Sequence, residues 1–132
     1  MIKNYYYLIV GVLAIFFAFT HAFNGQTVVI PMLNTEITDV NLRTVLFYVW
    51  HIITIENLIF GVAFLFMSFQ KDLSKVRFAA WIIAILMIVR FLVIFGGTLL
   101  YNAAGIKSIL IDSIAIFIYV SLILLGIRVK DK

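Results

Sequence analysis

Four long apolar runs dominate the sequence, and polar residues are rare within them. The runs extend over about residues 5–23, 44–69, 78–100 and 108–127. A helix of about 20 residues crosses the ~30 Å hydrocarbon core of a bilayer, so each run is long enough for one span. The pattern therefore predicts an all-α polytopic membrane protein, in which residues 1–132 form a single four-helix transmembrane bundle.

The connections between the runs predict how the spans follow one another. Two are short, which favours an up-down-up-down order. The first, residues 24–43, is longer and contains the only proline within the β-branched stretch 27–33. We expect an extended outer loop here, either packed on the top of the bundle or closing over a pocket as a lid. Thr38 or Asp39 is expected to cap the second helix, which would project above the bilayer.

Basic residues are concentrated on one side of the predicted bundle. These are Lys3, Lys71, Lys75, Arg77, Arg128, Lys130 and Lys132. The other side carries only Arg43 and Lys107. Because cytoplasmic flanks are enriched in Lys and Arg, both termini are predicted to be cytoplasmic, in a bacterial inner membrane.

A cleaved signal peptide is the competing interpretation of the first run. Lys3 precedes an apolar stretch, and Thr20, His21 and Ala22 resemble a small-residue cleavage site. Cleavage would leave three spans and a different topology.

Composition excludes several classes of function. Hydrophobic residues make up 65% of the chain and charged residues 12%, about half the charged fraction of a soluble domain, so a soluble enzyme is excluded. The net charge of +4 comes from flanks that follow membrane topology, so no nucleic-acid partner is expected. The chain has no cysteine, and therefore no disulfide and no thiolate metal ligand.

Polar residues within and beside the runs share one layer. Counted from the cytoplasmic end of its own run, each lies about 12 to 19 residues in, between the mid-plane and the outer surface. The set is His21, Asn24, His51, Thr54, Glu56, Asn57, Arg90 and Asp112. A charge at such depth costs about 2.5–3.5 kcal/mol on insertion scales, so Glu56 and Arg90 are expected to pair, with Asp112 or protonated His21 sharing the interaction.

This layer predicts an outward-facing intramembrane pocket that binds a polar or anionic ligand or a lipid headgroup. Arg90 is the expected anchor of that ligand. The protein would then be a small ligand-binding or accessory subunit.

The angular positions of these polar residues around their helix axes indicate whether their side chains can meet. His21 continues a stripe of small residues formed by Gly11, Ala14, Ala18 and Gly25, a face on which membrane helices approach closely. On the second helix, Trp50, Thr54, Asn57, Gly61 and Ser68 form a similar stripe. Glu56, however, lies about 140° from His51 around the helix axis. The second helix must therefore contact partners on more than one side, or Glu56 faces another subunit of a homo-oligomer or larger membrane complex.

Other functions would use the same residues differently. His21, His51, Glu56 and Asp112 are suitable metal ligands for a redox or hydrolytic enzyme, although the spacing contains neither His-Glu-x-x-His nor Glu-x-x-His. His21 and His51 are candidate haem ligands, and a quinone or a titrating carboxylate is a further possibility. A structural role in assembly is the third class. No serine-nucleophile or phosphate-loop motif is present, and the sequence specifies no reaction.

Overall fold

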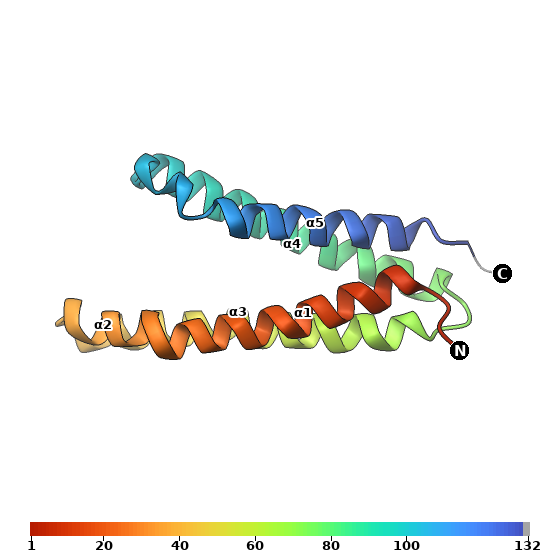
Figure 1. Cartoon of the computed structure of the whole chain (residues 1–132), viewed down its shortest axis with the longest axis horizontal. Coiled ribbons are helices and arrows are strands. Elements are labelled where there is room, and N and C mark those ends of the chain that lie inside the picture. The colour runs from red at the N-terminus through yellow and green to blue at the C-terminus, as the bar shows by residue number, and fades with distance from the viewer. Residues whose placement is uncertain (131–132) are drawn as a thin grey trace. The chain divides into compact units, whose positions relative to one another are not determined.

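The computed structural model describes residues 1–130 and consists of helices joined by short connections (Figure 1). A π-helix, Gly25–Val29, joins the first two α-helices, and a 3₁₀-helix, Ala103–Lys107, precedes the last. The α-helices are α1 (Tyr5–Asn24), α2 (Ile30–Glu36), α3 (Val40–Ser68), α4 (Ser74–Tyr101) and α5 (Leu110–Ile127). Lys132, which contributes to the predicted orientation, lies outside the described residues.

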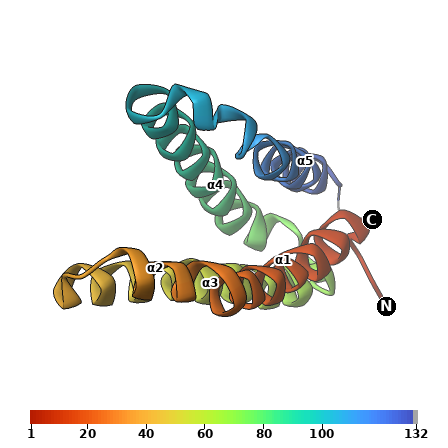
Figure 2. The ribbon, with the colours of Figure 1, turned by 60° about the vertical axis from the view of Figure 1, so that its left-hand side comes forward.

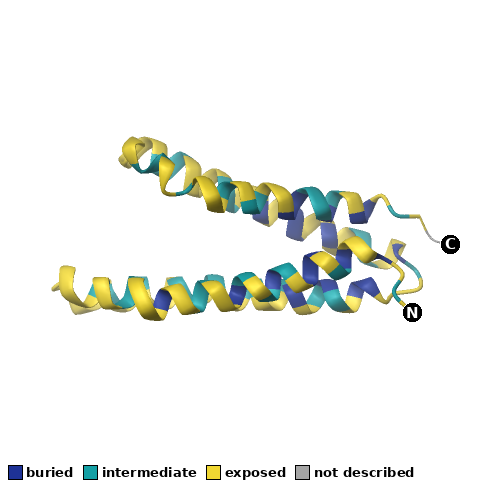
Figure 3. Ribbon diagram, in the orientation of Figure 1, coloured by how far each residue is buried: buried dark blue, intermediate teal, exposed yellow. Residues whose placement is uncertain are grey.

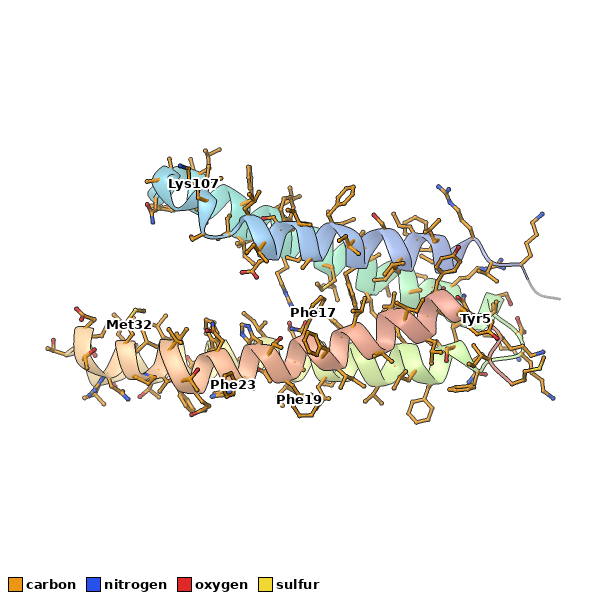
Figure 4. The ribbon with its side chains drawn as sticks, in the orientation of Figure 1. Tyr5, Phe17, Phe19, Phe23, Met32 and Lys107 are labelled. Atoms are coloured by element: carbon orange, nitrogen blue, oxygen red, sulfur yellow. The ribbon has the colours of Figure 1, made fainter. Side chains whose placement is uncertain are left out.

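Four helices in the described residues are long and apolar enough to cross a membrane, which confirms the expected fold class at this level. They are Tyr5–Glu36, Val40–Ser68, Ser74–Tyr101 and Leu110–Ile127. Only 11% of the apolar window in Val40–Ser68 is buried inside the protein. Exposed positions run along the helices in Figure 3, and Phe19 and Phe23 extend outward from α1 in Figure 4. Exposed apolar surface of this extent is typical of a membrane protein.

The expected extended loop at residues 24–43 is wrong, because helix continues through most of it. After α1, the Ile30 N–H donates to the Gly25 carbonyl and closes a π-turn, and α2 then runs to Glu36. Pro31 stands at the start of α2, where the missing N–H of proline is tolerated. Only residues 37–39 connect α2 to α3.

The predicted cap of α3 is confirmed at Asp39. Its Oδ1 accepts hydrogen bonds from the backbone N–H groups of Asn41, at 2.8 Å, and Leu42, at 3.1 Å. These are two of the amide donors that a helix leaves unsatisfied at its N-terminus, which explains why α3 begins at Val40.

The chain forms two compact units. Gly11–Ala63 is one of them, and in it α1 and α3 lie side by side and antiparallel (Figure 2). The small residues Gly11, Ala14 and Ala18 are buried along α1, and Gly25 is buried in the π-helix that follows, as the stripe predicts. Gly61 of α3 packs so closely on α1 that an added Cβ would lie 2.9 Å from the Gly11 carbonyl oxygen. Small residues therefore set the distance between the two helices.

The other unit comprises Met1–Val10 and Phe64–Lys132. Its core joins the start of α1, the end of α3, and the antiparallel pair α4 and α5. The Phe64 ring lies 5.3 Å from the Tyr7 ring and 6.4 Å from the Tyr119 ring, and Tyr7 and Phe64 are fully buried. The Asn4 side chain donates to the Gly126 carbonyl at 2.8 Å.

Two hydrogen bonds bring the basic segments together at one end of this unit. The Lys3 N–H donates to the Ser68 carbonyl at 2.8 Å, and the Arg77 guanidinium donates to the Val129 carbonyl at 3.0 Å. The N-terminus, the α3–α4 connection and the end of α5 therefore share one end. These are the segments that the sequence predicts to lie on one side of the membrane.

Gly61→Ala is predicted to destabilise the α1–α3 hairpin. The new Cβ would lie 2.6 Å from Ile15 Cγ1, so the helices must separate, at a cost of about 1–3 kcal/mol. Gly97→Ala is the matched control, because a Cβ there meets no heavy atom of the described residues within 4 Å. It should gain up to ~1 kcal/mol from helix propensity. Thermal unfolding in detergent measures both, and equal stability of the two variants would contradict the packing.

A second prediction concerns Asp72 in the α3–α4 connection. Hydrogen bonds from Ser74, and then the charge of Lys75, hold the pKa of this carboxyl below its ordinary value of 3.8. Its contribution to stability is therefore present above pH 3.8 and lost as the pH falls through the lower folded-state pKa. Asp72→Asn should remove this small acid-dependent part of the unfolding midpoint, and Ser74→Ala should reduce it. An unchanged acid profile in both variants would contradict the contact.

Candidate functional site

His21 and Trp50 form the centre of the half of the α1–α3 hairpin that lies nearer to α2. Their rings stack at 4.1 Å with an interplanar angle of 8°. The Trp50 indole N–H donates to the His21 carbonyl at 3.0 Å. Gly25 makes this possible, since a Cβ at that position would overlap Trp50 Nε1 and lie 2.7 Å from Cδ1. Gly25, the last residue of the stripe, therefore leaves the space that the Trp50 indole ring occupies.

His51 directly follows Trp50 in α3 and is held by a different set of neighbours. Its Nε2 lies 3.2 Å from Gln26 Nε2, and its ring meets Phe47 edge-on at 4.6 Å. The Gln26 amide can donate only if His51 is neutral with its proton on Nδ1. In that tautomer the imidazole accepts from Gln26 and keeps its Nδ1–H as a donor.

An open groove of about 340 Å³ lies beside His51 on α3. It is lined by Tyr48, His51, Ile52, Ile55 and Glu56, and its exposed surface is almost entirely apolar. His51 and Glu56 are about 140° apart around the axis, yet they border the same groove because Ile52 and Ile55 lie at intermediate angles between them. Their angular separation does not prevent a shared site.

The predicted pocket residues divide between the two units. His21, Asn24, His51, Thr54, Glu56 and Asn57 lie in Gly11–Ala63, whereas Arg90 and Asp112 lie in the other unit. The pairing of Glu56 with Arg90 therefore stays a prediction. Asn24 is exposed at the end of α1, and the buried Thr54 Oγ1 has no hydrogen-bond partner among residues 1–130.

Asp112 has a local explanation. It is exposed in the first turn of α5, which begins at Leu110. A carboxylate in the first turn is stabilised by the helix dipole and by nearby unsatisfied N–H groups. Arg90 is half-buried on α4.

The geometry gives no support to the metal and haem hypotheses. Within residues 1–130, neither unit gathers three or more His, Asp or Glu side chains where a metal ion could bind. The two imidazoles are engaged with different groups, His21 with Trp50 and His51 with Gln26. Haem ligation would instead need both rings to face one central plane.

Several residues of this region were not predicted as site residues. Gln26 carries no local motif, and its contact with His51 crosses the hairpin. Tyr48 lies three residues before His51 on α3, so its place in the groove follows from helical spacing. Gly25 and Trp50 stand on the two predicted stripes, so their meeting could have been anticipated from helical phase. Comparison with protein-family models, with curated proteins and with solved structures found no match for this chain. Function therefore has to be inferred from the side chains themselves.

Gly25→Ala is predicted to displace Trp50. The indole would lose both its space beside residue 25 and its hydrogen bond to the His21 carbonyl. The free energy of unfolding should therefore fall by about 1–3 kcal/mol. Trp81 is the other tryptophan, so a Trp81→Phe background makes Trp50 the only reporter. We expect altered emission of Trp50 and a lower unfolding temperature. Gly96→Ala is the control, because its Cβ would have no heavy atom of the described residues within 4 Å. Identical emission spectra of Gly25→Ala and the unsubstituted protein would contradict the close packing of Trp50 on Gly25.

Proposed function

We propose that this protein is a small integral membrane protein that binds the polar group of a lipid-like ligand in the groove lined by Tyr48, His51, Ile52, Ile55 and Glu56. The observation that carries the proposal is that His51 and Glu56 border one apolar groove on α3, a helix long and apolar enough to cross a membrane. Ionisable residues are costly within a bilayer and are therefore functional candidates wherever they occur there.

Depth along α3 supports a ligand taken from the membrane. Counted from Phe69 at the expected inner boundary, Glu56 lies about 20 Å and His51 about 27 Å along the helix. Both distances fall within the outer part of a ~30 Å hydrocarbon core. A ligand there must present apolar surface to Ile52 and Ile55 and polar atoms to the groove's edges.

The lining side chains suggest complementary roles. Tyr48 can donate or accept through its hydroxyl, His51 can donate from Nδ1 while Gln26 occupies Nε2, and Glu56 supplies carboxylate oxygens. Carbonyl or hydroxyl groups on an apolar body match this set, and a quinone is one such molecule. Arg90 and Asp112 are not needed for this site.

The membrane orientation forms part of the proposal. The basic segments near Lys3, Lys71, Lys75 and Arg128 share one end of their unit, and we infer that this end is cytoplasmic. The spans then run up-down-up-down, the groove opens in the outer leaflet, and the bacterial inner membrane is the expected location.

A structural role in assembly is the second candidate. The His21–Trp50 stack and the Gln26–His51 contact hold the register of two helices, which polar residues in membrane proteins commonly do. Under this alternative, the groove contacts another subunit instead of a small molecule.

Ile55→Trp tests the proposal by filling the groove. Ile59→Trp is the matched control, because Ile59 is an equally apolar, exposed residue one turn along α3 that does not line the groove. Mass spectrometry of organic extracts should find a small molecule with the wild type and with Ile59→Trp, but at least about tenfold less with Ile55→Trp, a change of about 1.4 kcal/mol. Equal amounts of the small molecule in extracts of all three proteins would overturn ligand binding in this groove. Loss of a co-purifying protein from Ile55→Trp alone would favour the structural role in assembly.

A further inference from the structure

A second groove lies at the outer end of the same hairpin, between α2 and α3. Its volume is about 410 Å³, and it is lined by Ile30, Asn34, Val40, Arg43, Thr44 and Phe47. Arg43, Asn34 and Thr44 provide polar atoms, whereas Ile30 and Phe47 provide an apolar wall. The groove is therefore amphipathic, unlike the apolar groove beside His51.

Arg43 is the only Lys or Arg in Gly11–Ala63. Its Nη1 makes one long contact, 3.5 Å, to the Asn34 carbonyl oxygen, and among residues 1–130 it forms no ion pair with a carboxylate. The nearest carboxylate in the sequence, Asp39, is engaged with the first amides of α3. The guanidinium therefore keeps N–H donors that can bind an anionic oxygen pair, the geometry in which arginine recognises phosphate.

The position of Arg43 along α3 indicates which kind of phosphate could reach its guanidinium. Arg43 precedes Phe69 by 26 residues, which is about 39 Å along α3 and about 9 Å beyond the ~30 Å hydrocarbon core, at the outer edge of the headgroup layer. Phe47 and Ile30 lie nearer to the hydrocarbon than Arg43 and Asn34 do. The polar and apolar parts of the groove thus follow the order of a phospholipid, with its phosphate outside and its acyl chain inside.

We propose that this groove binds a glycerophospholipid of the outer leaflet, with the phosphate on the Arg43 guanidinium and an acyl chain against Ile30 and Phe47. Glu36 and Asp39 belong to the same outer end, so a zwitterionic headgroup suits its charge better than a net anionic one. The site depends on the membrane location proposed above but not on the groove at Ile52 and Ile55.

The test uses delipidated full-length protein in detergent and three probes. These are phosphatidylethanolamine, diacylglycerol with the same acyl chains, and inorganic phosphate, with binding followed by native mass spectrometry. The wild type should bind phosphatidylethanolamine at least about tenfold more tightly than diacylglycerol, which corresponds to about 1.4 kcal/mol. Inorganic phosphate at equal concentration should not displace the phospholipid.

Variants separate the phosphate contact from general effects. Arg43→Gln should weaken phosphatidylethanolamine binding about tenfold, and Arg43→Lys should retain part of it, because lysine keeps the charge but not the planar fork. Lys107→Gln, which changes a cation that does not line the groove, should bind as the wild type does. Ile55→Trp should also bind normally, so failure of the site beside His51 leaves this result unaffected.

Three results would overturn the proposal. Equal affinity for diacylglycerol and phosphatidylethanolamine would show that the phosphate is not recognised. Unchanged phosphatidylethanolamine binding by Arg43→Gln would show that Arg43 does not bind the phosphate. Full displacement by inorganic phosphate would identify an anion site that does not require a lipid.

Discussion

The close contact of Gly61 with α1 sets the register on which the rest of the hairpin depends. Because Gly61 meets Gly11 and Ile15, two antiparallel helices are fixed at one short separation. The same register then produces three pairs further out: Gly25 with Trp50, Gln26 with His51, and Asn34 with Arg43. A change of distance at Gly61 would alter all three pairs, although none of them touches the glycine.

Specific contacts matter here because lipid provides little hydrophobic force between helices. Leucine and phenylalanine are as well solvated by acyl chains as by another helix, so association depends on close packing and on polar or aromatic contacts. In the hairpin, such contacts include the stacking of the His21 ring on Trp50 and the hydrogen bond between His51 and Gln26. The weak hydrophobic force between helices in lipid also explains why so much apolar surface stays exposed beside a small protein core.

The periodic features of the fold were predictable, and the features produced by contacts between distant residues were not. Run length predicts four spans, and the buried face of α1 follows from Gly11, Ala14 and Ala18. Asp39 was expected as a cap because its side chain acts on amides only two and three residues away. By contrast, Gln26 was missed because its partner lies 25 residues away on another helix.

The helical conformation of residues 25–36 was missed for a different reason. Local preferences of β-branched residues and Pro31 favour an extended segment, but a helix hydrogen-bonds its own backbone and so remains suited to a membrane boundary. Of the candidate site, the sequence identified His51 and Glu56. Their shared groove required the positions of Ile52 and Ile55 as well.

The π-turn at Gly25–Val29 changes the angular phase of the helix that follows it. One extra residue in a turn rotates all later side chains by about 100° relative to a regular α-helix. A regular continuation of the Gly11–Gly25 stripe would bring positions near 29 and 32 toward α3, whereas the groove is lined by Ile30 and Asn34. The extra residue in this turn therefore determines which face of α2 faces α3. If α1 and α2 were treated as one regular α-helix, the wrong residues would be expected to line the groove at Arg43.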